Sequence, residues 1–119
     1  MTVTLRREHD TIYRVDIAGR LRKADLDAAQ DAIAADLDGG TKIRVLVVLT
    51  RFQGWEPDAN WRDLTFYVRH GDEIERIAMV GDAAWCSEAL MFVGADLRKA
   101  EVRYFVSRDE SAAVEWLAG

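Results

Sequence analysis

The sequence predicts an α/β fold, a mixed five-stranded sheet with helices packed on it. Short segments rich in β-branched residues alternate with longer segments in which apolar residues recur every three or four positions. The segment at 43–49 is almost continuously apolar, which is typical of a strand covered on both faces of a parallel sheet. The first two strand-like segments follow each other without a helix, which predicts a hairpin and one antiparallel edge.

The predicted order of elements is β-β-α-β-α-β-α-β-α. The first helix has apolar residues on one side, and Gly39-Gly40 should end it. Pro57 fits the first turn of a second helix. Ser107 or Asp109 should cap a last helix that ends at Trp116-Leu117. The other predicted elements are strands at 3–5, 12–17, 43–49, 77–80 and 101–106, and helices at 23–37, 57–70 and 83–97.

Composition limits the classes of function. A chain of 119 residues with no internal repeat or linker predicts a single domain over residues 1–119. Its net charge of −5 argues against nucleic-acid binding and against purely electrostatic docking to an anionic membrane. The N-terminus lacks a signal-peptide core, and no apolar run approaches the ~20 residues of a spanning helix. Cys86 is the single cysteine. We therefore expect a soluble, cytoplasmic protein.

Several groups of residues, spread over essentially the whole chain, occur in an order that resembles one family. They are Phe52-x-Gly54, Ala59-x-Trp61-x-Asp63-x-x-Phe66-x-x-x-His70, Arg76-Ile77-Ala78-x-Val80-Gly81-Asp82-x-x-Trp85, Tyr104-Phe105 and Ala113-x-x-Trp116-Leu117. The set resembles the SpoIIAA-like family of small bacterial proteins, which share the STAS-like fold of sporulation anti-sigma-factor antagonists. The resemblance implies a STAS-like mixed sheet, a likeness to lipid-carrying CRAL-TRIO domains, and no enzymatic activity.

The sequence departs from the antagonists at one important position. The antagonists carry a phosphorylatable serine at the start of the helix that follows the third strand. Here residues 50–57 contain no serine, and Thr50, the only hydroxyl, should end the strand. Glu56 occupies the place where a helix N-terminus would favour a phosphate. We therefore do not expect a phosphorylation switch.

Aromatic residues are concentrated in the predicted second and third helices and in the loop before them. Trp61 shares a face with Leu64 and Val68 and is large enough both to pack on the sheet and to line a pocket. The apolar stripe of the helix at 83–97 is wider than one packed face needs, which fits either a helix buried between two neighbours or a helix that flanks a groove. In the second interpretation the groove lies between helices 57–70 and 83–97, at the carboxyl ends of parallel strands. Its candidate ligand-binding residues are Trp55, Trp61, Phe66, His70, Trp85 and Phe92.

Two hypotheses of function remain open. The first is a non-enzymatic binding module that holds an apolar or lipid-like small ligand in this groove. The second is a regulatory module that binds a protein partner through the loop at 50–58 without phosphorylation. The same apolar surface could pair two copies of the chain as a homodimer or rest on a membrane. Nearby acidic residues weaken the membrane interpretation: Asp63, Asp72, Glu73 and Glu75.

No residue set predicts a reaction, a cofactor or a metal site. The two histidines are far apart in sequence, with His9 expected in solvent and His70 expected in a helix cap or a local salt bridge. There is no Cys/His cluster for zinc, no calcium loop and no phosphate-binding glycine motif. Cys86 should be buried and inert, and Asp82 should cap the third helix. We therefore do not expect an enzyme.

Overall fold

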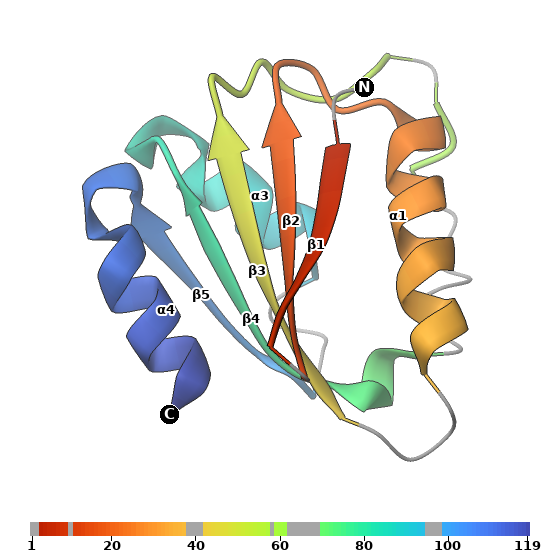
Figure 1. Cartoon of the computed structure of the whole chain (residues 1–119). Coiled ribbons are helices and arrows are strands. Elements are labelled where there is room, and N and C mark those ends of the chain that lie inside the picture. The colour runs from red at the N-terminus through yellow and green to blue at the C-terminus, as the bar shows by residue number, and fades with distance from the viewer. Residues whose placement is uncertain (1–2, 10, 38–41, 58, 62–69, 95–98) are drawn as a thin grey trace.

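The computed structural model describes residues 3–9, 11–37, 42–57, 59–61, 70–94 and 99–119 (Figure 1). Its strands are β1 (Val3–His9), β2 (Ile12–Ala18), β3 (Ile43–Thr50), β4 (Ile74–Gly81) and β5 (Glu101–Val106). Its α-helices are α1 (Lys23–Asp36), α3 (Cys86–Phe92) and α4 (Glu110–Ala118). Single 3-10 turns precede β4, α3 and α4: η1 (Gly71–Glu73), η2 (Ala83–Trp85) and η3 (Ser107–Asp109).

The five strands form one sheet in the order β1-β2-β3-β4-β5. β1 runs antiparallel to β2, and every other pair is parallel. This arrangement confirms the predicted mixed five-stranded sheet with one antiparallel edge. The register places five side chains in one row across all five strands: Leu5, Val15, Val47, Met79 and Tyr104.

Helices cover both faces of the sheet. α1 and α3 lie on one face and α4 on the other (Figure 1). Successive residues of β3 point to opposite faces, so Val45 packs toward the first face and Leu46 toward α4. Both are buried, which confirms the prediction from the apolar run at 43–49.

Two arginines attach α4 to the second face. Arg44 donates from Nη1 to the carbonyl oxygen of Leu117 at 2.6 Å, and Arg76 donates from Nη1 to that of Trp116 at 2.7 Å. The Arg76 guanidinium also lies 5.2 Å from the centre of a Trp116 ring. Cations at the C-terminal end of a helix satisfy its last carbonyl groups and its dipole. α4 is therefore held against this face, and the candidate site described below lies on the other one.

Several predicted element bounds were wrong. β1 runs to His9, where the predicted strand ended at residue 5, and β2 and β3 each end one residue later than predicted. β4 begins three residues earlier than predicted and ends one residue later, and α1 ends at Asp36, one residue short. The third helix was predicted over 83–97, but it opens as a 3-10 turn and its α-helical part ends at Phe92. Gly94 has φ +65°, a left-handed conformation that commonly terminates a helix. The predicted end at 97, most of the helix at 57–70 and Gly39-Gly40 lie outside the described residues.

Candidate functional site

The loop after β3 is joined by backbone hydrogen bonds to the segment that connects β2 to α1. Four backbone hydrogen bonds of 2.8–3.2 Å continue the parallel pairing beyond the carboxyl ends of β2 and β3. They run from Gly19 N–H to Thr50, from Gln53 N–H to Gly19, from Leu21 N–H to Gly54, and from Glu56 N–H to Leu21. The loop that carries Trp55 is therefore fixed at the edge of the sheet where open α/β folds keep their sites.

Glu56 has a different role from the one the sequence suggested. Its Oε1 accepts a hydrogen bond of 3.1 Å from the backbone N–H of Lys23, the first residue of α1. A carboxylate is stabilising at a helix N-terminus, and here the N-cap residue, Arg22, makes no side-chain capping bond. Glu56 thus joins the loop to α1.

The aromatic side chains of this loop and of the α3 segment form one cluster. Trp55 lies with its ring centre 5.1 Å from Phe52, 5.9 Å from Trp85 and 5.2 Å from Phe92. Such edge-to-face and tilted pairs each contribute about 0.5–1.5 kcal/mol beyond their buried area. Gly54, which precedes Trp55, has φ +97°, a conformation that favours glycine. The cluster holds Trp55 from three sides.

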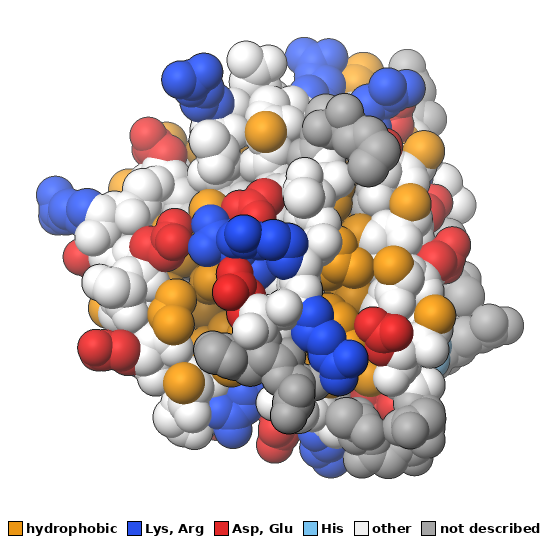
Figure 2. All heavy atoms as spheres, in the orientation of Figure 1, with side chains coloured by type: hydrophobic (Ala, Val, Ile, Leu, Met, Phe, Trp, Pro, Cys, Tyr) orange, Lys and Arg blue, Asp and Glu red, His pale blue; other side chains and the backbone are white. Residues whose placement is uncertain are grey.

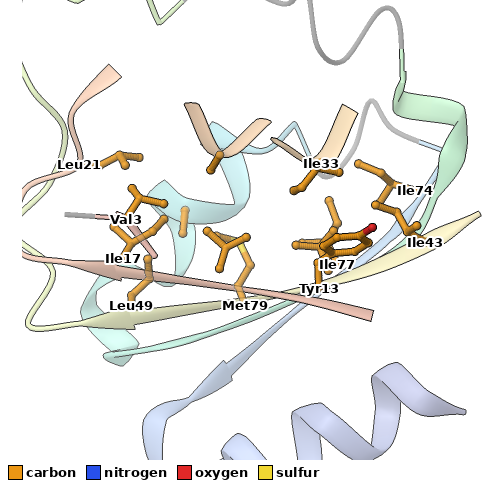
Figure 3. Close-up of a cluster of buried hydrophobic side chains, with 14 of the residues drawn as sticks. Val3, Tyr13, Ile17, Leu21, Ile33, Ile43, Leu49, Ile74, Ile77 and Met79 are labelled. Atoms are coloured by element: carbon orange, nitrogen blue, oxygen red, sulfur yellow. The ribbon is translucent and has the colours of Figure 1, made fainter. Parts of the chain in front are cut away.

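Beside this cluster the structure contains an apolar cavity of about 170 Å³, partly open to solvent. It lies between the first face of the sheet and the side of α1 that faces the sheet. In Figure 3, Ile33 of α1 points toward the sheet, and Ile77 and Met79 point back at it. Figure 2 shows hydrophobic side chains between the sheet and α1, on the right of the view. The lining residues used below are Leu26, Ala29, Val47, Trp55, Trp61, Met79, Ala89 and Phe92.

Polar groups at the cavity are few. Lys23 and Gln30 of α1 contribute to the lining. The Lys23 ammonium forms an ion pair with Asp27, one helical turn along. The two tryptophans that line the cavity differ, since Trp61 Nε1 donates to the carbonyl oxygen of Glu56 at 2.8 Å. Trp55 Nε1 is shielded from solvent and makes no hydrogen bond within the described structure.

The structure separates the six predicted site residues into three groups. Trp55, Trp61 and Phe92 line the cavity. Trp85 does not line it but packs against Trp55, at 5.9 Å between ring centres. His70 does not line it either, and its Nδ1 lies 2.8 Å from Glu73 Oε1, which confirms the expected local salt-bridge contact.

The sixth residue, Phe66, lies outside the described residues, and so does most of helix 57–70. Sequence reasoning missed the contribution of α1 to the site. Leu26, Ala29 and Ile33 share the apolar stripe of α1, and all three line the cavity.

Two further groups near the cluster have structural roles. Asp82 Oδ1 accepts from the N–H of Ala84 at 2.8 Å, which confirms Asp82 as the cap of the α3 segment. Tyr104 donates its hydroxyl to the carbonyl oxygen of Asp82 at 2.6 Å. Burial, with the negative charges of Cys86 and Asp82, raises the pKa of Tyr104 to about 12. The prediction that Cys86 is buried was wrong, because it lies at the start of α3 and is half-buried.

Two features are absent from the described residues. No group of three or more His, Cys, Asp or Glu side chains in this part of the chain is arranged to hold a metal ion. None of the helices that the structure describes is long and apolar enough to cross a membrane.

Comparison with known proteins agrees with the fold and with the sequence motifs. The sequence model of the SpoIIAA-like family matches residues 12–118. A similar solved structure is the crystal structure of an uncharacterized protein from the DUF3478 family, with a SpoIIAA-like fold, from Shewanella loihica PV-4. The two chains are 25% identical and superpose with a TM-score of 0.73. The match covers 97% of this chain and 91% of the other. A search of curated proteins finds no match. On the family match and the shared fold, this chain belongs to the SpoIIAA-like family.

Proposed function

We propose that this protein is a non-enzymatic binding module that holds a small apolar or lipid-like molecule between the sheet, α1 and the Trp55 cluster. The observation that supports the proposal is the cavity of about 170 Å³ with its largely apolar lining. An apolar cavity of ~150 Å³ stays dry and binds benzene. The size therefore suits one aromatic ring or a short branched alkyl group.

The lining supplies contact and excludes water, but it does not suggest a reaction. Among the described lining residues the one with an ionisable side chain is Lys23, and its charge is balanced by Asp27. Binding would draw on apolar burial, at about 25 cal/mol for each Å² removed from water. Phe92 lines the cavity and is 36% exposed, so the cavity reaches the surface beside α3. A longer acyl chain could leave the cavity at this point.

The test is native mass spectrometry of the purified protein, followed by denaturing extraction and identification of any released small molecule. The wild type should carry an apolar molecule that the Ala29→Leu variant carries less of, because the added carbon atoms occupy the cavity. Ala32→Leu is the matched control, since Ala32 lies on the exposed side of the same helix. Equal loads in all three proteins would contradict the proposed site, and a wild type without any bound mass would favour the next candidate.

The second candidate is a regulatory module that binds a protein partner without phosphorylation. Met91 is 80% exposed and adjoins Phe92 at the end of α3, which gives a partner an apolar contact. The loop at 50–58 is less suitable than the sequence suggested, because Phe52 and Trp55 are packed in the cluster. Partner capture by wild type and by Met91→Asp tests this candidate, and a partner retained by the variant would exclude the Met91 surface.

Homodimer formation and membrane contact stay predictions that concern the same surface. Sedimentation of wild type and Met91→Asp tests dimer formation, and flotation of the same two proteins with vesicles tests membrane contact. Dimers or vesicle binding that persist unchanged in Met91→Asp would show that another surface is responsible.

A further inference from the structure

The segment at 19–22, which connects β2 to α1, extends the edge of the sheet. Leu21 bonds to the loop after β3 through both its N–H and its carbonyl oxygen, and Arg22 has an extended backbone. In parallel pairing, the neighbours of such a residue direct their backbone groups to the opposite side. The backbone N–H and C=O of Arg20 accordingly make no hydrogen bond in the described part of the chain. This edge therefore offers a donor and an acceptor to a further strand.

The side chains of this segment alternate between the core and solvent. Leu21 is 1% exposed and lines the apolar cavity, whereas Arg20 and Arg22 are exposed and line a shallow, open hollow. Arg51 brings a third exposed guanidinium to the same end of the sheet, because Gly19 bonds to the loop on both sides of it. Figure 2 shows Lys and Arg side chains along the top of the view, where Figure 1 places this segment and the loop after β3.

The charge of these three arginines is uncompensated. None of them forms an ion pair or a side-chain hydrogen bond with any residue that the structure describes. A shortage of carboxylates does not explain this, because the chain has 21 acidic and 16 basic residues. Glu56 lines the same hollow, but its Oε1 accepts from the N–H of Lys23. Asp16 of β2 is likewise engaged, with Arg14.

We propose that this edge binds an acidic segment of a partner protein in an extended conformation. The segment adds a strand beside Arg20 through backbone hydrogen bonds and presents carboxylates at alternate positions to Arg20 and Arg22. Side chains two residues apart in a strand lie on the same face, so the two charge patterns match. Backbone bonds supply affinity in this mode of recognition, and alternate side chains supply specificity. The inference goes beyond the proposed function, since the cavity lies on the side of Leu21 and not of the arginines.

The observations favour a short acidic segment over other anions. A nucleic acid or an anionic membrane presents a large array of negative charge, which the net charge of −5 repels. A single phosphate ion is held by donors that converge on one point. Here Arg20 and Arg22 follow each other along an exposed, extended backbone, which suits a linear partner with spaced charges.

The probe is a fluorescein-labelled heptapeptide in which glutamate and valine alternate. One control peptide has glutamine in place of each glutamate, and a second keeps the composition but gathers the glutamates at one end. Fluorescence anisotropy measures their affinities for wild type, Arg20→Gln/Arg22→Gln, Arg51→Gln and Arg108→Gln, each checked for folding by circular dichroism. Arg108 is the matched control, because it is also exposed and without a partner among the described residues, but it follows β5.

We expect the alternating peptide to bind wild type saturably and Arg20→Gln/Arg22→Gln about fivefold to tenfold more weakly. Arg51→Gln should weaken binding about twofold to fivefold, and Arg108→Gln less than about twofold. Each control peptide should bind wild type at least about fivefold more weakly than the alternating one. In NMR spectra of the wild type, the Arg20 amide proton should move downfield on binding, and that of Ala113 on α4 should not.

Each part of the proposal has its own refutation. An alternating peptide that does not bind, or that binds all four proteins equally, would overturn the surface. Equal binding of the alternating and gathered peptides, or an Arg20 amide that does not shift in wild type, would overturn the strand pairing. Inorganic phosphate and vesicles containing phosphatidylserine are titrated in parallel. If either of them binds through the arginines while the peptide does not, the occupant is not a protein segment.

Discussion

Filling the cavity from α1 should make the protein more stable. Ala29 lines the cavity from the middle of α1 and is 8% exposed. The Ala29→Leu substitution adds three carbon atoms at a helical position, and leucine is nearly as good a helix former as alanine. In a tightly packed core the same change would force strained rotamers and backbone shifts. The sign of the effect therefore reports whether the space exists.

The structure sets the magnitude. The cavity of about 170 Å³ has room for three more carbon atoms. Burying the added carbon atoms contributes about 2 kcal/mol, at ~0.8 kcal/mol each. Ordering the leucine side chain opposes this by about 0.5–1 kcal/mol. The expected gain is about 1–1.5 kcal/mol, or a rise in Tm of about 5 °C for a domain of this size.

The assay is thermal and urea unfolding followed by circular dichroism on wild type, Ala29→Leu and Ala32→Leu. Ala32 lies on the exposed side of α1, so its variant should stay within ~0.5 kcal/mol of wild type. A loss of about 1–3 kcal/mol in Ala29→Leu, with Ala32→Leu unchanged, would show that the space is closed and would refute the reasoning. The protein is first stripped of bound molecules, because a ligand that binds the folded state raises the apparent stability.

Three further predictions concern the support of the fold. Arg76→Met should destabilise the protein by about 1–2 kcal/mol in urea unfolding, because it removes the hydrogen bond and the ring contact to Trp116. An unchanged free energy of unfolding would show that these two contacts do not stabilise α4 on the sheet. Gly81→Ala should destabilise by about 1–3 kcal/mol, since its Cβ would lie 2.6 Å from the hydroxyl oxygen of Tyr104; a neutral result would mean that this contact relaxes freely. The pKa of Tyr104, about 12 when folded, lies above that of an unfolded tyrosine, so its neutral phenol stabilises fully below pH ~10 and this contribution is lost as the pH rises through about 12. Wild type should therefore lose more stability than Tyr104→Phe over that pH range, and parallel curves would contradict the assignment.

The sheet could be predicted from the sequence because its signals are local. The apolar run at 43–49 predicted a strand buried on both faces, and alternation at 12–17 predicted one side of the hairpin. Bounds failed where a boundary depends on tertiary contacts. β4 starts at Ile74 because Ile74 pairs with Ile43 of β3 and Arg76 pairs with both β3 and β5, although the charged side chains of Glu75 and Arg76 hid the strand pattern.

The site could be predicted only in part. Trp55, Trp61 and Phe92 were identified from aromatic excess near strand ends, and the structure brings them to one cavity. The missing wall, α1, could not be assigned, because the stripe of a helix does not say which strands it covers. Trp85 was grouped with the lining, but its ring packs against Trp55, at 5.9 Å between ring centres, and does not line the cavity.

The most direct test of the central claim is a two-dimensional NMR titration of the labelled protein with α-methylstyrene. Val47 and Leu46 are neighbours in β3 that face opposite sides of the sheet, so they form a built-in comparison. Saturable shifts should appear at Val47, Met79 and Ala89, which line the cavity, and not at Leu46 or at Ala113 of α4. Shifts centred on the α4 face, or no saturable shift at all, would contradict a ligand site between the sheet and α1.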